Sequence, residues 1–178
     1  MKTMNIRIGI LTVSDRASRN ERPDLSGQSL IAKVAEKDWQ TINYQVIPDD
    51  YERIKSLLVS WCDSELLDVI LTTGGTGFSP RDVTPEATQA VIQRQAPGVA
   101  EAMRQASMSV TPHAMLSRAV AGIRRHTLII NLPGSPKAAV ENFSVVAPVL
   151  PHAIELLRDN PTAEAGHHNL DIRPNSEA

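Results

Sequence analysis

The sequence has few of the residues that disulfides, membrane spans and nucleic-acid surfaces require. It contains one cysteine, so no disulfide can form within the chain, and we expect a protein of the reducing cytoplasm. Aromatic residues make up 3% of the chain, and 18 basic against 20 acidic residues leave a net charge of −2. Nucleic-acid binding generally uses a basic surface and stacking platforms, so we expect no such partner. No apolar run approaches the length of a membrane span, and we expect no membrane association.

The 178 residues have the length of one domain that can bury a sizeable core. The first 13 residues have a basic start and a short apolar stretch. Arg7 interrupts this stretch, and no small-residue cleavage site follows it. We expect a first strand there rather than a signal peptide. From Arg158 the composition turns polar. We therefore expect a folded domain over residues 1–157 and a polar tail over 158–178 that is mobile or lies on a neighbouring subunit.

Apolar segments suited to strands alternate along the chain with amphipathic segments suited to helices. Between residues 111 and 126 the pattern is less regular and indicates a short helix followed by a strand or hairpin arm. The alternation predicts an α/β protein with three layers, α/β/α, and a mostly parallel central sheet. The expected strands are 6–13, 42–47, 66–71 and 127–132, and the expected helices are 26–39 (capped by Ser26), 51 onward, 84 onward, 99–108, 136–145 and 149–157.

The third expected strand leads through a glycine-rich turn, residues 74–77, into a helix. Residues 66–71 are too continuously apolar for a half-exposed strand, so we expect this strand to be covered on both faces. Thr84 suits the N-cap of the following helix, and Pro85 suits its first position. The turn lacks the lysine of a P-loop and the spacing of a dinucleotide fingerprint. It is either a tight turn that needs positive φ or a phosphate site made of backbone N–H groups beside a helix N-terminus.

Polar residues follow the other expected strands as well, and ligands of parallel sheets bind beyond such strand ends. We expect these ends to form one shared pocket, in which Asp49 and Asp82 could hold Mg²⁺ beside a phosphate group. The alternative for each is an ordinary turn or capping aspartate; Asp15 is an alternate ligand, and Asp50 is favoured as a helix cap. Five basic side chains are either counter-charges for an anionic ligand or solvated surface: Arg104, Arg118, Arg124, Arg125 and Lys137.

The stretch T-T-G-G-T-G-F-S-P-R-D-V-T-P-E-A-T, residues 72–88, resembles the signature of the molybdenum-cofactor biosynthesis family that includes the MogA and MoaB proteins and the G domain of gephyrin. The resemblance continues in I-G-I-L-T-V-S-D, V-I-P-D-D, L-S-R-A-V-A-G-I and I-I-N-L-P-G-S-P-K-A, and it covers about residues 6–155. It implies a molybdopterin-binding fold of the MoaB/Mog type. It also implies a homotrimer and contacts with other proteins of cofactor biosynthesis.

The same resemblance implies molybdopterin adenylyltransfer, in which ATP and molybdopterin give adenylylated molybdopterin and pyrophosphate with the help of Mg²⁺. It assigns the activity and the metal to Asp49 and Asp82. Two alternatives remain open: a molybdopterin-binding or scaffold protein of the MoaB type without turnover, and a nucleotide or pyrophosphate hydrolase. The positions that match the family's cofactor-binding and nucleotide-binding residues are Ser14, Thr73, Gly74, Gly75, Thr76, Gly77, Ser107, Pro133, Gly134 and Ser135.

Overall fold

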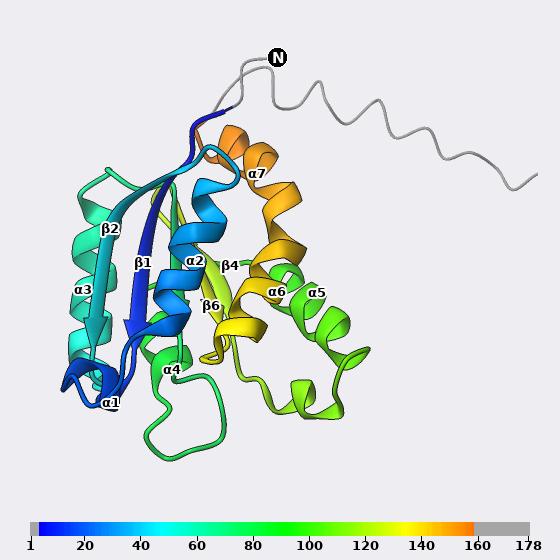
Figure 1. Ribbon diagram of the computed structural model, residues 1–178. Coiled ribbons are helices and arrows are strands. Elements are labelled where there is room, and N and C mark those ends of the chain that lie inside the picture. Colours follow the sequence, from blue (N-terminus) through cyan, green and yellow to red (C-terminus); the bar gives the residue numbers. More distant parts are fainter. Residues whose placement is uncertain (1–3, 159–178) are drawn as a thin grey trace, which may run out of the picture.

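The computed structural model describes residues 4–158, which form a six-stranded sheet between two layers of helices (Figure 1). The strand order is β2-β1-β3-β6-β5-β4. The first four of these strands run parallel, whereas β5 and β4 form an antiparallel edge. The expected three-layer α/β fold with a mostly parallel sheet is therefore confirmed. The strands are β1 (Arg7–Val13), β2 (Gln40–Ile47), β3 (Val69–Thr73), β4 (Arg94–Gln95), β5 (Ala121–Arg124) and β6 (Thr127–Leu132).

Helices cover both faces of the sheet, as the continuous apolar strands require. The layer of α2, α5, α6 and α7 packs on one face, and α3 and α4 pack on the other. The helices are α1 (Asp15–Ser18), α2 (Leu25–Ala35), α3 (Tyr51–Asp63), α4 (Thr84–Gln89), α5 (Pro97–Met108), α6 (Pro136–Val146) and α7 (Leu150–Leu157), with 3₁₀ turns η1 (Pro112–Leu116) and η2 (Ala147–Val149).

Strand β3 lies in the middle of the sheet and is buried along its whole length. Its alternating side chains belong to two separate hydrophobic cores. Leu71 lies in the core that contains Phe143 of α6, and Ile70 lies in the core that contains Leu58 of α3. This confirms that the strand is covered on both faces. Leu66, however, is 54% exposed and precedes the strand, so the expected start of the buried run at this residue is wrong.

Helix α2 begins and ends differently from the prediction. Its N-cap is Asp24, whose carboxylate accepts the N–H of Gly27 at 3.0 Å, and Ser26 lies inside the first turn instead of capping it. The helix ends at Ala35 and not near residue 39, because Asp38 takes φ +57°, which a helix cannot accommodate. The carboxylate of Asp24, and not the hydroxyl of Ser26, therefore caps the helix.

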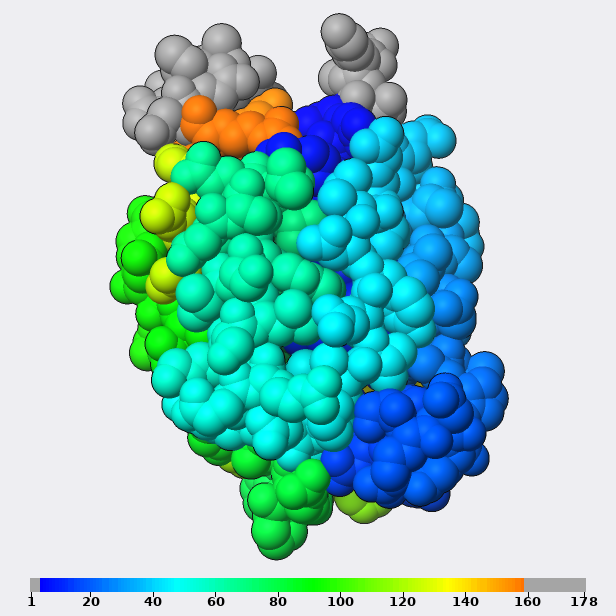
Figure 2. Space-filling model, turned by 90° about the vertical axis from the view of Figure 1, so that its left-hand side faces the viewer, coloured from blue at the N-terminus to red at the C-terminus, as the bar shows by residue number. Residues whose placement is uncertain are grey.

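The two ends of the sheet differ in character. The first described residues and α7 lie at one end, and the segments that follow the carboxyl ends of β1 and β3 lie at the other (Figures 1 and 2). At the first end, the buried carboxylate of Asp68 binds both Arg7 and Arg158. No helix within residues 4–158 has the length and apolarity needed to cross a membrane. Apart from Arg158 the expected tail, residues 158–178, lies outside the described residues, so the division at residue 157 stays a prediction.

Candidate functional site

Two adjacent pockets open at the carboxyl ends of the parallel strands. The strand register lets these ends finish almost level: Thr12 of β1 is opposite Thr73 of β3, which is opposite Leu132 of β6. The larger one, here the polar pocket, has a volume of about 610 Å³. Its walls combine four carboxylates and three arginines with backbone turns: Thr12, Val13, Ser14, Asp15, Arg16, Ala17, Arg22, Pro23, Asp24, Leu25, Ser26, Asp49, Thr73, Gly74, Gly75, Ser79, Arg81, Asp82, Gly134, Ser135 and Pro136.

The smaller one, here the apolar pocket, has a volume of about 270 Å³ and lies between α5, η1 and α6. Its floor carries a polar pair, in which Ser107 and Asn142 are hydrogen-bonded at 3.0 Å. Met103 and Leu116 contribute apolar wall. Such a mixture of apolar walls and a few fixed polar groups suits a flat organic ring system.

All four strand ends line the polar pocket, so the expectation of a shared pocket that contains Asp49 and Asp82 is confirmed. The turns after β3 and β6 also line the apolar pocket, so the predicted site residues are divided between the two pockets. Eight of the predicted site residues line the polar pocket: Ser14, Asp49, Thr73, Gly74, Gly75, Asp82, Gly134 and Ser135. The other four line the apolar pocket: Thr76, Gly77, Ser107 and Pro133.

Glycine is required at two positions of the turn after β3. Gly74 and Gly75 take φ values of +100° and +65°. A Cβ atom on Gly74 would lie 2.2 Å from the carbonyl oxygen of Val13. A Cβ atom on Gly75 would lie 2.4 Å from the hydroxyl of Thr84 and 3.1 Å from the carboxylate of Asp49. The tight-turn interpretation is thus confirmed, and the turn also brings the backbone against a candidate catalytic carboxylate.

Hydrogen bonds join the turn after β3 to the turn after β6. The hydroxyl of Thr73 donates to the carbonyl of Pro133 at 2.7 Å, and the N–H of Gly74 donates to the carbonyl of Leu132 at 3.3 Å. The next three amide groups, those of residues 75–77, have no hydrogen-bond acceptor within the described part of the chain. Backbone N–H groups of this kind are available to an anionic ligand, which is the arrangement that the phosphate-site interpretation requires.

The helix after this turn does not supply the expected dipole. The N-cap of α4 is Val83, without a side-chain hydrogen bond, and Thr84 occupies the first helical position, so the predicted Thr84 cap is wrong. The Thr84 hydroxyl is buried with no partner among the described residues. Neither Thr84 nor Pro85 lines the polar pocket. The N-terminus of the longer helix α6 does, where Ser135 accepts the N–H of Ala138 at 3.1 Å.

Asp49 is joined to Asp15 by two reciprocal hydrogen bonds. The carboxylate of Asp49 accepts the N–H of Asp15 at 2.9 Å, and the carboxylate of Asp15 accepts the N–H of Asp49 at 3.1 Å. Burial raises the pKa of Asp49, and the charges of Asp15 and Asp82 add to this increase. Burial also acts to raise the pKa of Asp15, but the hydrogen bonds from Arg81 and from the Asp49 amide outweigh it, so the pKa of Asp15 is lowered.

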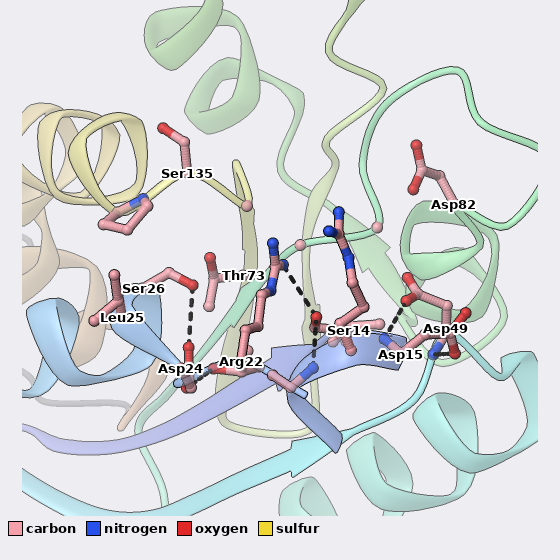
Figure 3. A pocket seen from close by; sticks show the side chains of 18 of the residues that line it. Ser14, Asp15, Arg22, Asp24, Leu25, Ser26, Asp49, Thr73, Asp82 and Ser135 are labelled. Atoms are coloured by element: carbon pink, nitrogen blue, oxygen red, sulfur yellow. Dashed lines mark hydrogen bonds between the residues drawn. The ribbon is translucent and has the colours of Figure 1, made fainter. Parts of the chain in front are cut away.

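Asp82 lies on the turn above Asp49, on the same side of the polar pocket (Figure 3). Its carboxylate accepts the N–H of Ser79 at 3.0 Å, so it organises its own loop and not the start of α4. Next to it, the guanidinium of Arg81 binds both oxygens of Asp15 at 2.9 Å. Ser135 and Leu25 lie across the pocket from these residues. The pocket therefore has an acidic side that one exposed arginine partly neutralises.

Sequence reasoning missed four charged residues of the polar pocket: Arg16 and three residues whose side chains are hydrogen-bonded. Arg22 donates to the hydroxyl of Ser14 at 3.1 Å, and Asp24 accepts the hydroxyl protons of Thr12 and Tyr44. Burial acts to raise the pKa of Asp24, but these hydrogen bonds and the amide of the α2 cap lower it overall. The third of these, Arg81, directly precedes Asp82. A count of the charged residues near each strand end would have found Arg16 and Arg81 but not Arg22 or Asp24.

The carboxylates fit one way of binding magnesium. No group of three or more His, Cys, Asp or Glu side chains in residues 4–158 is arranged to hold a metal by itself. Mg²⁺ is commonly held by one or two carboxylates together with phosphate oxygens of a substrate and water. Asp49 and Asp82 line the same pocket, and the charge of Asp82 contributes to the raised pKa of Asp49. These two side chains are thus the residues that would hold Mg²⁺ with a bound nucleotide.

The family described as "probable molybdopterin binding domain" matches residues 9–152. The chain belongs to this family. It is 42% identical to a molybdopterin adenylyltransferase from Helicobacter pylori, over 87% of this chain and 89% of that protein. It is 44% identical to gephyrin from Dictyostelium discoideum, over 96% of this chain but only 25% of gephyrin's length. The crystal structure of the molybdopterin biosynthesis enzyme MoaB from Thermus thermophilus superposes with a TM-score of 0.82 at 49% identity, over 88% of this chain and 98% of that one. The family resemblance and the MoaB/Mog-type fold are thereby confirmed.

Proposed function

We propose that this protein transfers the adenylyl group of ATP to molybdopterin and releases pyrophosphate. The observation that carries the proposal is the pair of adjacent pockets separated by the glycine turn. A transfer between two substrates needs two sites whose reacting ends meet, since correct orientation alone removes a large part of the barrier. The relatives named molybdopterin adenylyltransferase, at 40–42% identity, support this assignment.

We assign ATP to the polar pocket and the pterin to the apolar pocket. The polar pocket has the volume and the charged walls that a triphosphate and a ribose need. The apolar pocket offers Ser107 and Asn142 to the polar edge of a pterin and apolar wall to its faces. The unpaired amides of residues 75–77 lie at the boundary and are assigned to phosphate oxygens near the reacting centre.

In this reaction an oxygen of the terminal phosphate of molybdopterin attacks the α-phosphorus of ATP. The bond between the α-phosphorus and the bridging oxygen breaks, and pyrophosphate leaves with that oxygen. The attacking phosphate is already ionised at neutral pH, so no general base is needed, and the protein acts by positioning anions and neutralising charge. Asp49 and Asp82 would hold Mg²⁺, which supplies positive charge to the phosphate oxygens.

The alternative is a molybdopterin-binding or scaffold protein of the MoaB type without turnover. The 49% identity to the Thermus MoaB supports this alternative. A nucleotide or pyrophosphate hydrolase is the third candidate. All three share the fold and the pockets, and they differ in what happens to ATP when the pterin is present or absent.

The discriminating experiment combines ATP, Mg²⁺ and molybdopterin with the purified protein and with two variants. Asp82→Asn should abolish product formation and leave molybdopterin binding intact, because Asp82 lies outside the apolar pocket. Asp38→Asn is the matched control, since Asp38 is exposed, lies outside both pockets and has a φ of +57° that asparagine tolerates. Molybdopterin binding without product would favour the scaffold, and ATP consumption without an acceptor would favour the hydrolase.

We extend the proposal to a homotrimer in the cytoplasm that exchanges substrate or product with other proteins of cofactor biosynthesis. The family resemblance supports the trimer and the partners. The presence of a single cysteine, which cannot form a disulfide within the chain, supports the reducing compartment. Light scattering at several concentrations would test the trimer directly.

A further inference from the structure

The loop that carries Asp82, here the Asp82 loop, comprises residues 77–82 and lies at the surface. Phe78 is 67% exposed, and the side chain of Arg81 is 64% exposed, so the loop has little apolar contact with the core. Within the described part of the chain, two arginines make all the hydrogen bonds that join this loop to the rest of the protein: Arg81 with Asp15, and Arg118. The conformation of a surface loop with so little apolar contact depends on these few hydrogen bonds.

Arg118 holds both ends of the Asp82 loop with one guanidinium. Its Nε donates to the carbonyl of Gly77 at 2.7 Å, and its Nη2 donates to the carbonyl of Asp82 at 2.6 Å. Its Nη1 pairs with the carboxylate of Glu86 in α4. The planar guanidinium presents donors on three separate nitrogens in a fixed fork, which allows it to make all three contacts at once. The guanidinium is therefore hydrogen-bonded within the protein and is not a solvated surface group, whereas its role as a ligand counter-charge stays a prediction.

The backbone of Arg118 connects the Asp82 loop to the apolar pocket. The N–H of Arg118 donates to the carbonyl of Thr76 at 2.9 Å, and Thr76 lines that pocket. The two residues before it in sequence, Leu116 and Ser117, line the same pocket. A ligand that displaces this wall would thus move the residue that holds Asp82, which lies in the other pocket.

We propose that Arg118 is a positioning residue that fixes Asp82 for adenylyl transfer and communicates occupancy of the apolar pocket to the polar pocket. The proposal rests on the proposed function, because it takes Asp82 as a residue of that reaction. Arg118 itself lines neither pocket and so acts only through the loop. A misplacement of about 1 Å at a reacting site can lower a rate about 100-fold.

Removal of the guanidinium should therefore lower turnover more than it lowers substrate affinity. Arg118→Gln should decrease kcat about 10- to 100-fold and leave KM for ATP within about threefold. Arg118→Lys should be intermediate, because it keeps the positive charge but loses the planar fork of separate nitrogens that binds the two carbonyls. Glu86→Gln should have a small effect on kcat, since it removes the ion pair and leaves both loop contacts in place.

The matched control is Arg124→Gln. Arg124 is another partly buried arginine, and it combines a two-point ion pair with Asp63 and a contact to a backbone carbonyl, outside both pockets. A general loss of stability should affect both arginine variants, whereas the loss of kcat should be confined to Arg118→Gln.

Hydrogen exchange gives a readout that does not depend on activity. The hydrogen-bonded amides of Ser79, Arg81 and Asp82 should exchange about tenfold faster in Arg118→Gln than in the wild type and be unchanged in Arg124→Gln. Unchanged exchange in Arg118→Gln overturns the positioning role, whatever the catalytic result. If the wild type makes no product while exchange responds as expected, the proposed function fails and the structural role of Arg118 stands. If Asp82→Asn abolishes transfer while Arg118→Gln keeps full kcat, the proposed function stands and this inference fails.

Discussion

Asp15 and Asp49 each accept the backbone N–H of the other through their side-chain carboxylates, at 2.9 and 3.1 Å. This reciprocal pair ties the segment after β1 to the segment after β2 and holds two negative charges at the wall of the polar pocket. Arg81 balances only the Asp15 member directly. The arrangement leaves Asp49 as a partly buried carboxylate whose charged form is disfavoured, and it predicts how the stability of the protein depends on pH.

Asp49→Asn should stabilise the protein at neutral pH while it abolishes transfer. Burial raises the pKa of Asp49, so the folded state binds this proton more tightly than the unfolded state does, and ionised Asp49 destabilises the fold. The variant should gain about 0.5–1 kcal/mol in the free energy of unfolding at pH 7. The gain should shrink as the pH falls through the raised pKa and vanish below about pH 4, the ordinary aspartate pKa, where the carboxyl is protonated in both states. Urea unfolding at several pH values measures this difference. A loss of stability at pH 7, or a gain that is the same at every pH, would argue against the assignment.

Gly75→Ala should destabilise the fold and abolish transfer together. The new Cβ would meet the Thr84 hydroxyl at 2.4 Å and the Asp49 carboxylate at 3.1 Å, in a backbone conformation that alanine disfavours. We expect a loss of about 1–3 kcal/mol in the free energy of unfolding. Gly98→Ala is the control, because a Cβ on Gly98 has no neighbour within 4 Å. Chemical denaturation of both variants checks the difference, and equal stability of the two would refute the packing argument.

Arg81→Gln should weaken ATP binding without a large effect on stability. The ion pair between Arg81 and Asp15 is largely exposed, and such pairs contribute about 1 kcal/mol or less. Loss of this cation from the acidic side of the polar pocket should increase KM for ATP about tenfold, equivalent to about 1.4 kcal/mol. Arg19→Gln removes a similar exposed ion pair, with Glu21, outside both pockets. Steady-state kinetics at varied ATP will compare them. The same KM in both variants would exclude Arg81 from nucleotide binding.

Asp68→Asn should lower stability and leave turnover unchanged, because Asp68 lies at the opposite end of the sheet from both pockets. Its carboxylate is 3% exposed and binds the backbone and guanidinium of Arg7 and the guanidinium of Arg158. We expect a loss of about 1–3 kcal/mol at pH 7. Burial acts to raise the pKa of Asp68, but these hydrogen bonds outweigh it and lower the pKa. The stabilisation is thus present above about pH 4 and is lost as the pH falls through the lowered pKa, so the effect of the substitution should disappear in acid. Asp63→Asn, at an exposed ion pair, is the control for thermal unfolding, and a change in kcat in Asp68→Asn would contradict this separation.

The sequence was sufficient for the elements that periodicity and turn chemistry determine. The buried run of β3 and the Asp50 cap of α3 both follow from local residue preferences, and the structure confirms them. The cap of α4 could not be predicted from local preferences. The hydroxyl of Thr84 is buried and lies next to Gly75, so it does not cap the helix. Tertiary packing prevailed there over a local preference.

The predicted site residues all lie at the pockets, but their arrangement and the contributions of Arg22 and Asp24 could not be predicted from the sequence. Every predicted site residue lines a pocket, yet nothing local to Thr76 or Gly134 indicates that the two face different pockets. Arg118 shows the same limit more strongly. Its contacts with Gly77 and Asp82 span 41 and 36 residues of sequence, so only the folded chain brings them together.

The central claim is that one adenylyl group crosses from the polar pocket to a pterin in the apolar pocket. The most direct test incubates the purified protein with molybdopterin, Mg²⁺ and ATP labelled at the α-phosphorus, and measures both the labelled pterin and the pyrophosphate. We predict that the label appears on molybdopterin with one pyrophosphate released for each adenylyl group transferred. Molybdopterin that binds but acquires no label, or pyrophosphate released without a labelled pterin, would contradict the claim.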